Sequence, residues 1–322
     1  MDSQSPISTD GPEAPPVLDV LGLGVAVRDA TVWLDHFPAP DEKLPAEAFV
    51  ESGGGPVPTA LVVLSRLGRR CGFVGLVGDD EAGRFVRREL EREGVDTRGL
   101  ETRPGHETPT SVILVVGPHR TICEWRQEVV PVAPEALVPL RPALEGCRAL
   151  HVDARMPDAQ SEAAAIVRRH GGVVMLDAGH PRPGVDLLLP NVDIAILSST
   201  FPGRLPDAPE PEAFLDDLAS RLPDDGPRIA GLTLGPDGCL LRDGDGSLVR
   251  IPGHAIEAVD TTGAGDVFHA AFLDAHLDGA DVEAAGRFAN GAAALKCLGR
   301  SGRAPLPDRA AIRDFSGLAS NA

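Results

Sequence analysis

The stretch that decides both the fold and the chemistry is AVDTTGAGDVFHAAF, residues 258–272. An extended segment enters the turn Gly263-Ala264-Gly265, and an apolar helix of small residues is predicted to start there. The first N–H groups of a helix lack intrahelical partners and point outward with the positive end of the helix dipole. Because the turn residues are small, a phosphate or a developing anion can approach this backbone closely. The turn is therefore a candidate anion hole.

Asp266 closes the turn, where its carboxylate can accept a proton from an alcohol. Phosphoryl transfer to a hydroxyl needs an anion hole and a base close together, since its catalysis rests on positioning and charge stabilisation. For an isolated Gly-x-Gly-Asp, a simple helix cap would be the better interpretation. The longer string Asp260–Asp266 favours the catalytic interpretation.

Outward from this turn, short apolar runs alternate with helical patterns along the chain. The predicted strands cover residues 17–24, 71–77, 149–152, 172–176, 193–197 and 229–234. The predicted helices cover residues 56–67, 79–93, 267–277 and 282–298. This alternation is typical of an α/β fold with a mostly parallel sheet covered by helices on both faces.

Two segments interrupt the alternation, residues 29–50 and 108–125. Each contains short β-type runs between Pro- or Gly-rich turns, which predict antiparallel strands outside the main sheet. We expect a small β-sheet lid from about residues 27–52 and 107–126, within one domain over residues 17–322. Residues 1–16 are rich in Ser, Pro, Asp and Glu and are expected to be a disordered tail, not a targeting peptide.

The composition excludes several classes of partner. The 322 residues carry a net charge of -18, which argues against a nucleic-acid or anionic-membrane surface. No apolar run reaches the roughly 18 residues of a membrane span. Five cysteines stand without C-x-x-C spacing and no secretory signal is present, so we expect reduced thiols and a cytoplasmic protein.

DTTGAGD followed by an apolar helix of small residues resembles the second signature of the ribokinase (PfkB) family of carbohydrate kinases. Other segments follow in the family's order: LGLGVAVRD (21–29), SGGG (52–55), ALVVLSRLG (60–68), VGLVGDDEAGRFVRRELEREGVDT (74–97), TLGPDG (233–238) and GAAALKCLG (291–299). The resemblance spans about residues 18–315. It implies a ribokinase-like three-layer α/β/α fold, ATP with Mg²⁺, and a sugar or sugar-like alcohol as acceptor.

The resemblance also implies roles for individual residues. Asp266 is similar to the catalytic base, and the backbone of Gly263, Ala264 and Gly265 to the anion hole. The implied acceptor-binding residues are Asp29, Gly53, Gly54 and Gly55. Those implied near the nucleotide are Thr233, Gly235, Gly238, Asn290 and Ala294, with Lys296 on the same helix as either a pocket residue or a solvated charge. Asp260 and Thr262 match positions that contribute to a monovalent-cation site in some members, which suggests K⁺.

The chain departs from the common family pattern at two places. Relatives carry Asn-x-x-Glu after the strand at 194–197, whereas this chain has Ser198-Ser199-Thr200-Phe201. We therefore expect Asp177 or Asp153 to make the water-mediated contact to Mg²⁺. Many sugar kinases also carry Asn-x-x-Asn after the glycine pair, where Gly55 and Pro58 stand here.

Both departures resemble the branch that contains ketohexokinase and sulfofructose kinase, which favours a ketose-type acceptor. Lys43, Arg120 and Arg126 add positive charge near the implied sugar site, where they could bind a phosphate or sulfonate group. The alternative is that these arginines solvate a lid edge, where charge discourages strand addition. The family also implies a homodimer formed through the lid.

Other functions remain to be weighed against a kinase. A catalytically silent sugar- or nucleotide-binding regulator would account for the missing Asn-x-x-Glu, but it would not need both an anion hole and a base. A dinucleotide dehydrogenase and a P-loop kinase are disfavoured, because G-x-G-x-x-G after the first strand and G-x-x-x-x-G-K-[ST] are both absent. His151, His180 and His269 are expected to be structural.

Overall fold

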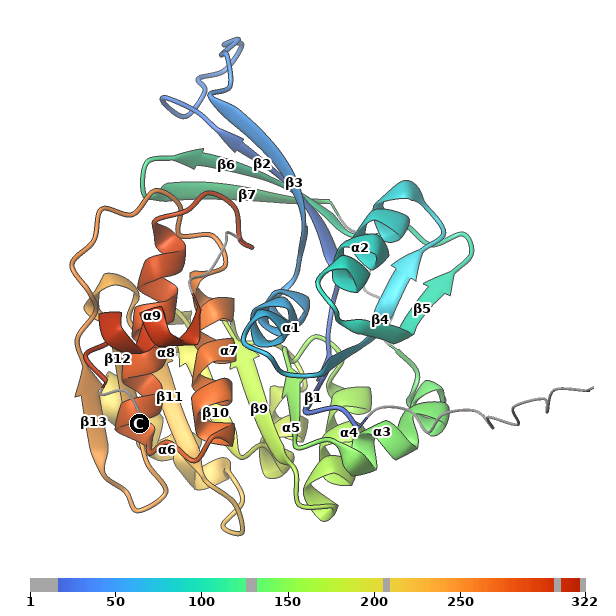
Figure 1. The fold of residues 1–322 in the computed structure, drawn as a ribbon, viewed down its shortest axis with the longest axis vertical. Helices are drawn as coiled ribbons and strands as arrows, with labels where there is room; N and C mark the ends of the chain where they lie inside the picture. The colour runs from blue at the N-terminus through green and yellow to red at the C-terminus, as the bar shows by residue number, and fades with distance from the viewer. Residues whose placement is uncertain (1–16, 126–131, 205–208, 304–307, 319–322) are drawn as a thin grey trace, which may run out of the picture.

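The computed structural model describes residues 17–125, 132–204, 209–303 and 308–318. The expected disordered tail, residues 1–16, and Arg126 lie outside the described residues. The expected α/β architecture is confirmed, with a large, mostly parallel sheet and a second, small sheet (Figure 1).

The large sheet has nine strands in the order β13-β12-β11-β10-β9-β8-β1-β4-β5. Its strands are β1 (Val20–Leu23), β4 (Cys71–Gly78), β5 (Asp96–Arg103), β8 (Ala149–Val152), β9 (Val173–Ala178), β10 (Ile194–Ser198), β11 (Ile229–Thr233), β12 (Cys239–Arg242) and β13 (Leu248–Ile251). The strands from β5 to β11 pair in parallel, and β12 and β13 add an antiparallel edge. The parallel strands are buried apolar runs because helices cover both faces of the sheet.

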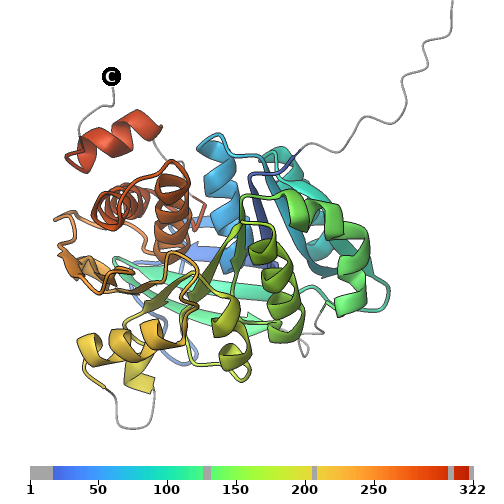
Figure 2. The same cartoon turned by 90° about the horizontal axis from the view of Figure 1, so that it is seen from below.

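Two helical layers enclose the large sheet (Figure 2). One layer holds α1 (Pro56–Arg66), α7 (Ala264–Leu277), α8 (Val282–Cys297) and α9 (Arg309–Phe315), with α2 (Glu81–Arg92) beside them. The other holds α3 (Arg141–Gly146), α4 (Pro157–Arg169), α5 (Val185–Leu188) and α6 (Pro211–Arg221). The predicted helices and strands therefore match the structure to within a few residues at each end.

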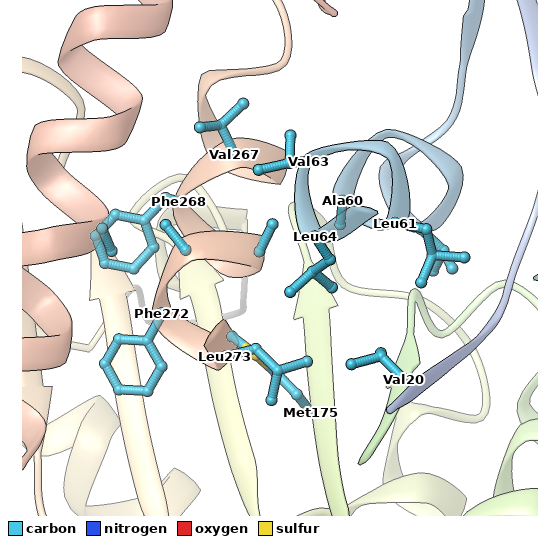
Figure 3. Close-up of a cluster of buried hydrophobic side chains, with 14 of the residues drawn as sticks. Val20, Ala60, Leu61, Val63, Leu64, Met175, Val267, Phe268, Phe272 and Leu273 are labelled. Atoms are coloured by element: carbon cyan, nitrogen blue, oxygen red, sulfur yellow. The ribbon is translucent and has the colours of Figure 1, made fainter. Parts of the chain in front are cut away.

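Helix α7 lies at the centre of its layer and packs against α1 over the strands (Figure 3). Its buried side chains include Phe268, Phe272 and Leu273, and those of α1 include Leu61 and Leu64. Both faces of this contact are almost entirely apolar, which fixes the beginning of α7 relative to the sheet. The turn that precedes α7 is thus carried by one of the best-packed helices of the molecule.

The small sheet, which we call the lid, has the strand order β3-β2-β6-β7 and stands above one end of the large sheet (Figure 1). Its strands are β2 (Val27–Trp33), β3 (Ala48–Gly54), β6 (Thr110–Val116) and β7 (His119–Trp125). The expectation that these strands are all antiparallel is wrong at one pairing, because β2 and β6 run parallel. They belong to separate insertions and no hairpin joins them, so nothing local forces them to be antiparallel.

In the described part of the chain, no helix combines the length and apolar character needed to cross a bilayer. All five cysteines have free thiols, and Cys123 on the lid is the exposed one.

Candidate active site

The glycine-rich turn has the geometry of an open helix N-terminus. Gly263 precedes the first residue of α7 with φ 75°, a left-handed conformation that favours glycine. A side chain at Gly263 would also collide with the backbone of Gly302. Gly265, in contrast, is exposed, and a Cβ placed on it would meet no described atom within 4 Å. Gly263 is thus required by the fold, whereas the space above Gly265 is open to a ligand.

Asp260 anchors the entry to this turn and is completely buried. Its Oδ1 accepts from the Thr262 N–H at 2.8 Å, and its Oδ2 accepts from the Ser301 N–H at 2.9 Å. Its main-chain oxygen accepts from Lys296 Nζ at 2.7 Å, and its N–H donates to the Cys297 oxygen at 3.2 Å. The turn is therefore tied to the end of α8 and to the segment that follows it.

Asp266 lies in the first turn of α7, next to other carboxylates. Desolvation raises the pKa of Asp266 well above its usual range, and the charges of Asp177 and Asp29 raise it further. The guanidinium groups of Arg303 and Arg120 oppose this shift. A carboxylate with a raised pKa is a better proton acceptor, as a general base for an alcohol must be.

Asp177, at the end of β9, is held by a histidine of α7. His269 Nδ1 lies 3.2 Å from Asp177 Oδ2 and 2.6 Å from the Gly265 oxygen, and its Nε2 lies 2.8 Å from the Ile196 oxygen. Each ring nitrogen of His269 thus lies within hydrogen-bond distance of a main-chain oxygen. Burial raises the pKa of Asp177, and the charge of His269 opposes that rise. The expected structural role of His269 thus includes holding Asp177 close to Asp266.

The lid contributes Asp29 to the same cluster. Asp29 lies beside Gly54, where a side chain would occupy the position of its carboxylate. Burial raises the pKa of Asp29 to about 6, while the charge of Arg303 and a hydrogen bond from Ser111 oppose the rise. Asp29 and Asp266 influence each other electrostatically although 237 residues separate them in the chain. The structure therefore brings together the expected base and the expected acceptor-binding aspartate.

Arg303 is the main site residue that sequence reasoning missed. It is buried, with 8% of its surface exposed, and its guanidinium covers the face of Gly53. Its Nη1 lies 3.3 Å from Glu89 Oε2, which also accepts from the Gly53 N–H. Its Nε and Nη2 have no hydrogen-bond partner among the described residues. Such buried donors are costly unless a ligand uses them. No motif marks Arg303, because its neighbours in the site come from α2 and the lid.

The three basic residues expected at the acceptor site behave differently from one another. Arg120, on β7, donates from Nη1 to Thr261 Oγ1 at 2.6 Å and so joins the lid to the catalytic turn. Lys43 is exposed on the connection between β2 and β3. The structure therefore brings Arg120 to the cluster around Asp266.

The residues expected near the nucleotide gather on the other side of α7. Thr233 ends β11, and Gly235 and Gly238 bracket the short turn that follows, both with positive φ. Asn290 donates from Nδ2 to the oxygens of Ile251 and Pro252, both at 3.3 Å. Its amide thus holds the segment after β13. Ala294 lies one helical turn further along α8 and is partly buried.

This site brings together the N-terminus of α7, an aspartate with a raised pKa (Asp266) and polar side chains of the lid. A comparison with known families matches residues 19–309 to the pfkB family of carbohydrate kinases. The chain belongs to this family. It is a carbohydrate kinase, as the site geometry and the match over most of the chain agree.

The pfkB-family relatives have varied names. An ATP-dependent ribose-1-phosphate kinase from Halopiger xanaduensis is 30% identical over 300 residues, covering 92% of this chain and 97% of the relative. A nucleoside kinase from Methanothermobacter thermautotrophicus is 27% identical over 311 residues, covering 92% and 96%. Neither relative is named a ketohexokinase or sulfofructose kinase, so the expected branch finds no support in them.

Solved structures agree with the ribokinase-like fold. A putative ribokinase from Agrobacterium tumefaciens has a TM-score of 0.82 and 28% identity, covering 94% of this chain and 98% of that one. A putative ribokinase II from E. coli, solved with ATP and Mg²⁺, has a TM-score of 0.78 and 21% identity, covering 93% and 99%.

The residues of this kinase fit an indirect mode of Mg²⁺ binding. Among the described residues, no group of three or more His, Cys, Asp or Glu side chains forms a metal cage. Mg²⁺ usually keeps several waters and binds through one or two carboxylates plus substrate phosphates. Asp177 is such a carboxylate next to Asp266. After β10, the hydroxyls of Ser198 and Thr200 bond each other at 3.0 Å, so this segment offers hydroxyls where relatives have a carboxylate.

A methyl group at Gly265 should separate stability from activity. Because the space around its Cβ is open and Gly265 is helical, we expect Gly265→Ala to raise the free energy of unfolding by about 0.5 kcal/mol. We expect its kcat to fall at least about tenfold, since the methyl group occupies the space of the transferred phosphoryl group. Urea unfolding and steady-state kinetics measure the two effects. Gly263→Ala is the matched control and should lose stability; unchanged kcat in Gly265→Ala would contradict the anion-hole assignment.

Replacing Asp29 should change stability in a pH-dependent way. The pKa of Asp29 in the folded protein, about 6, lies above the ordinary value of 3.8. The contribution of the protonated Asp29 to stability is therefore fully present below pH 3.8 and is lost as the pH rises through about 6. We therefore expect Asp29→Asn to be more stable than the wild type at pH 8, on the order of 1 kcal/mol, with the gain shrinking toward pH 4. Urea unfolding at both pH values checks this. Asp35→Asn, at an exposed carboxylate, should show no such trend.

Proposed function

We propose that this kinase transfers the terminal phosphoryl group of ATP to a hydroxyl of a ribosyl acceptor, such as ribose, a ribose phosphate or a nucleoside. The observation that carries the proposal is the meeting of Asp266 and Asp29 across the site, with Arg303 beside them. The names of the two relatives support a ribosyl acceptor over the ketose that the sequence pattern favoured.

The chemical step assigns one role to each side chain. Asp266 takes the proton of the acceptor hydroxyl, while the oxygen of that hydroxyl forms a bond to the terminal phosphorus of ATP. The bond from that phosphorus to the bridging oxygen then breaks, and ADP leaves. The N–H groups at Gly263, Ala264 and Gly265 would stabilise the charge on the transferred group, the one at Ala264 while it also donates to the Thr261 oxygen at 3.2 Å. Asp177 would hold Mg²⁺ through water, and the ion would supply further neutralisation of the phosphate oxygens.

On the acceptor side, Asp29 would accept hydrogen bonds from sugar hydroxyls and Arg303 would donate to sugar oxygens. The unpartnered Nε and Nη2 of Arg303 support this role. Arg303 is then a charge that would meet an anionic substituent. Because Glu89 and Asp29 lie close to its guanidinium, the site can accept neutral acceptors as well.

Release of ADP, measured across acceptors, tests the proposed function. We expect ribose, ribose 1-phosphate or a nucleoside to give a kcat/KM at least about tenfold above that of fructose or a sulfonated ketose. A ketose as the best acceptor would restore the ketohexokinase-like interpretation and overturn this one. No ADP release with any acceptor would favour the silent regulator.

Removal of the base tests the mechanism. We expect Asp266→Asn to lower kcat by about 10³-fold with ATP affinity changed by no more than a few fold, since a general base contributes about 10²–10⁴-fold. The control, Asp158→Asn on the exposed start of α4, should retain full activity. Substantial turnover in Asp266→Asn would remove this residue from the base role.

We also propose that two chains pair through the outer face of the lid. Residues on alternate positions face the site, Asp29 and Arg120 among them, and the other set faces outward. The outward set includes the exposed side chains of Phe49, Val112 and Trp125. Exposed apolar patches of this kind mark interaction surfaces. Sedimentation equilibrium should give a dimer mass for the wild type and a monomer mass for Val112→Asp; a monomeric wild type would contradict this pairing.

A further inference from the structure

Lys296 is a buried lysine at a place where the family pattern leads one to expect a metal ion. It lies in the last turn of α8 with none of its surface exposed, so it is not the solvated helix charge considered from the sequence. Its Nζ donates to the main-chain oxygen of Asp260 at 2.7 Å. Burial lowers the pKa of Lys296, and the charge of Asp260 opposes this shift. Asp260 thus supplies the negative charge that keeps a buried ammonium favourable.

The use of lysine here is selective. The chain contains 28 arginines and two lysines, Lys43 and Lys296, and Lys43 is exposed on the lid. Arginine presents a planar fork, whereas lysine presents a compact point charge with three donors. Only the ammonium resembles a monovalent metal ion in shape and charge.

The residues around Asp260 do not fit a bound K⁺. All three of its oxygens already accept hydrogen bonds, from Thr262, Ser301 and Lys296. A second cation at Asp260 would stand beside the fixed ammonium, and like charges repel strongly where solvent is excluded. The Thr262 hydroxyl is buried and has no partner among the described residues, but one hydroxyl does not make a cation site. The expectation of K⁺ at Asp260 and Thr262 is therefore not supported by the geometry.

We propose that the ammonium of Lys296 replaces the monovalent cation, so that the enzyme needs no K⁺. The ammonium fixes Asp260 and hence the turn that leads to Gly263 and Asp266. It also places a positive charge behind the anion hole, within electrostatic reach of Asp266. Lys296 acts through the turn and is a positioning residue. The measurements of kcat that test this inference rest on the proposed function. The measurements of Tm with and without K⁺ do not.

The first test compares the wild type in KCl and in choline chloride at the same ionic strength of about 0.1 M, which holds screening constant. We expect kcat to differ less than about twofold between the salts, and Tm to be the same in both. Activation of about fivefold or more by K⁺, or a rise in Tm specific to K⁺, would overturn the proposal.

The second test compares two variants that both remove the charge of Lys296. Lys296→Ala removes the ammonium and leaves room for an ion, whereas Lys296→Met removes the charge and fills the space. In choline chloride we expect both to lose at least about tenfold in kcat. KCl or NH₄Cl should restore activity and raise Tm in Lys296→Ala, and should do neither in Lys296→Met. A folded Lys296→Ala that is fully active in choline, or that no cation restores, would overturn the proposal.

The Tm readout separates this inference from the proposed function. If no acceptor supports ADP release by the wild type, the kinase proposal fails. The proposal that the Lys296 ammonium replaces K⁺ is then still tested by the Tm of Lys296→Ala, which should be higher in KCl than in choline chloride. If ADP release is normal but K⁺ stabilises the wild type, only the replacement fails.

Discussion

The buried carboxylate of Asp260 is the constraint on which the site depends. The two hydrogen bonds of this carboxylate and the two of the Asp260 main chain join three parts of the chain: the turn itself, the end of α8 and the segment at Ser301. These hydrogen bonds are buried, and a buried donor or acceptor without a hydrogen-bond partner would cost stability. Because the turn is held from behind, the N–H groups at the start of α7 keep a fixed position, that of Ala264 donating to the Thr261 oxygen at 3.2 Å. The packing of α7 against α1 keeps this arrangement in place relative to the sheet.

The same hydrogen bonds also position Gly302 and Arg303, which follow Ser301 in the chain. Where the chain continues past Ser301, it brings Gly302 against Gly263 and Arg303 against Gly53. Asp266, the lid and the segment that carries Arg303 therefore meet at one place, where their charged groups shift the pKa values of one another. The pKa values of Asp29 and Asp266 are both raised, mainly by burial, and the charge of Arg303 opposes both shifts.

Local patterns were sufficient for most elements of the large sheet, because apolar runs and glycine stops report burial directly. They failed for strands that are rich in charge or very short. β5 was missed because this edge strand is rich in charge, and the hairpin of β12 and β13 because its runs are short. The parallel pairing of β2 with β6 and the placing of Arg303 depend on contacts between distant segments. No periodicity along the chain records such contacts, so sequence patterns alone could not reveal them.

Two of the connections that join the lid to the rest of the molecule are short: residues 24–26, between β1 and β2, and Gly55, between β3 and α1. These two connections touch, since a side chain on Gly55 would strike the oxygen of Val25. Asp29 and Gly54 lie just beyond them, so the residues that we propose to contact an acceptor are also those nearest the joint. An acceptor bound as proposed would therefore contact the lid where the lid is attached to the rest of the molecule.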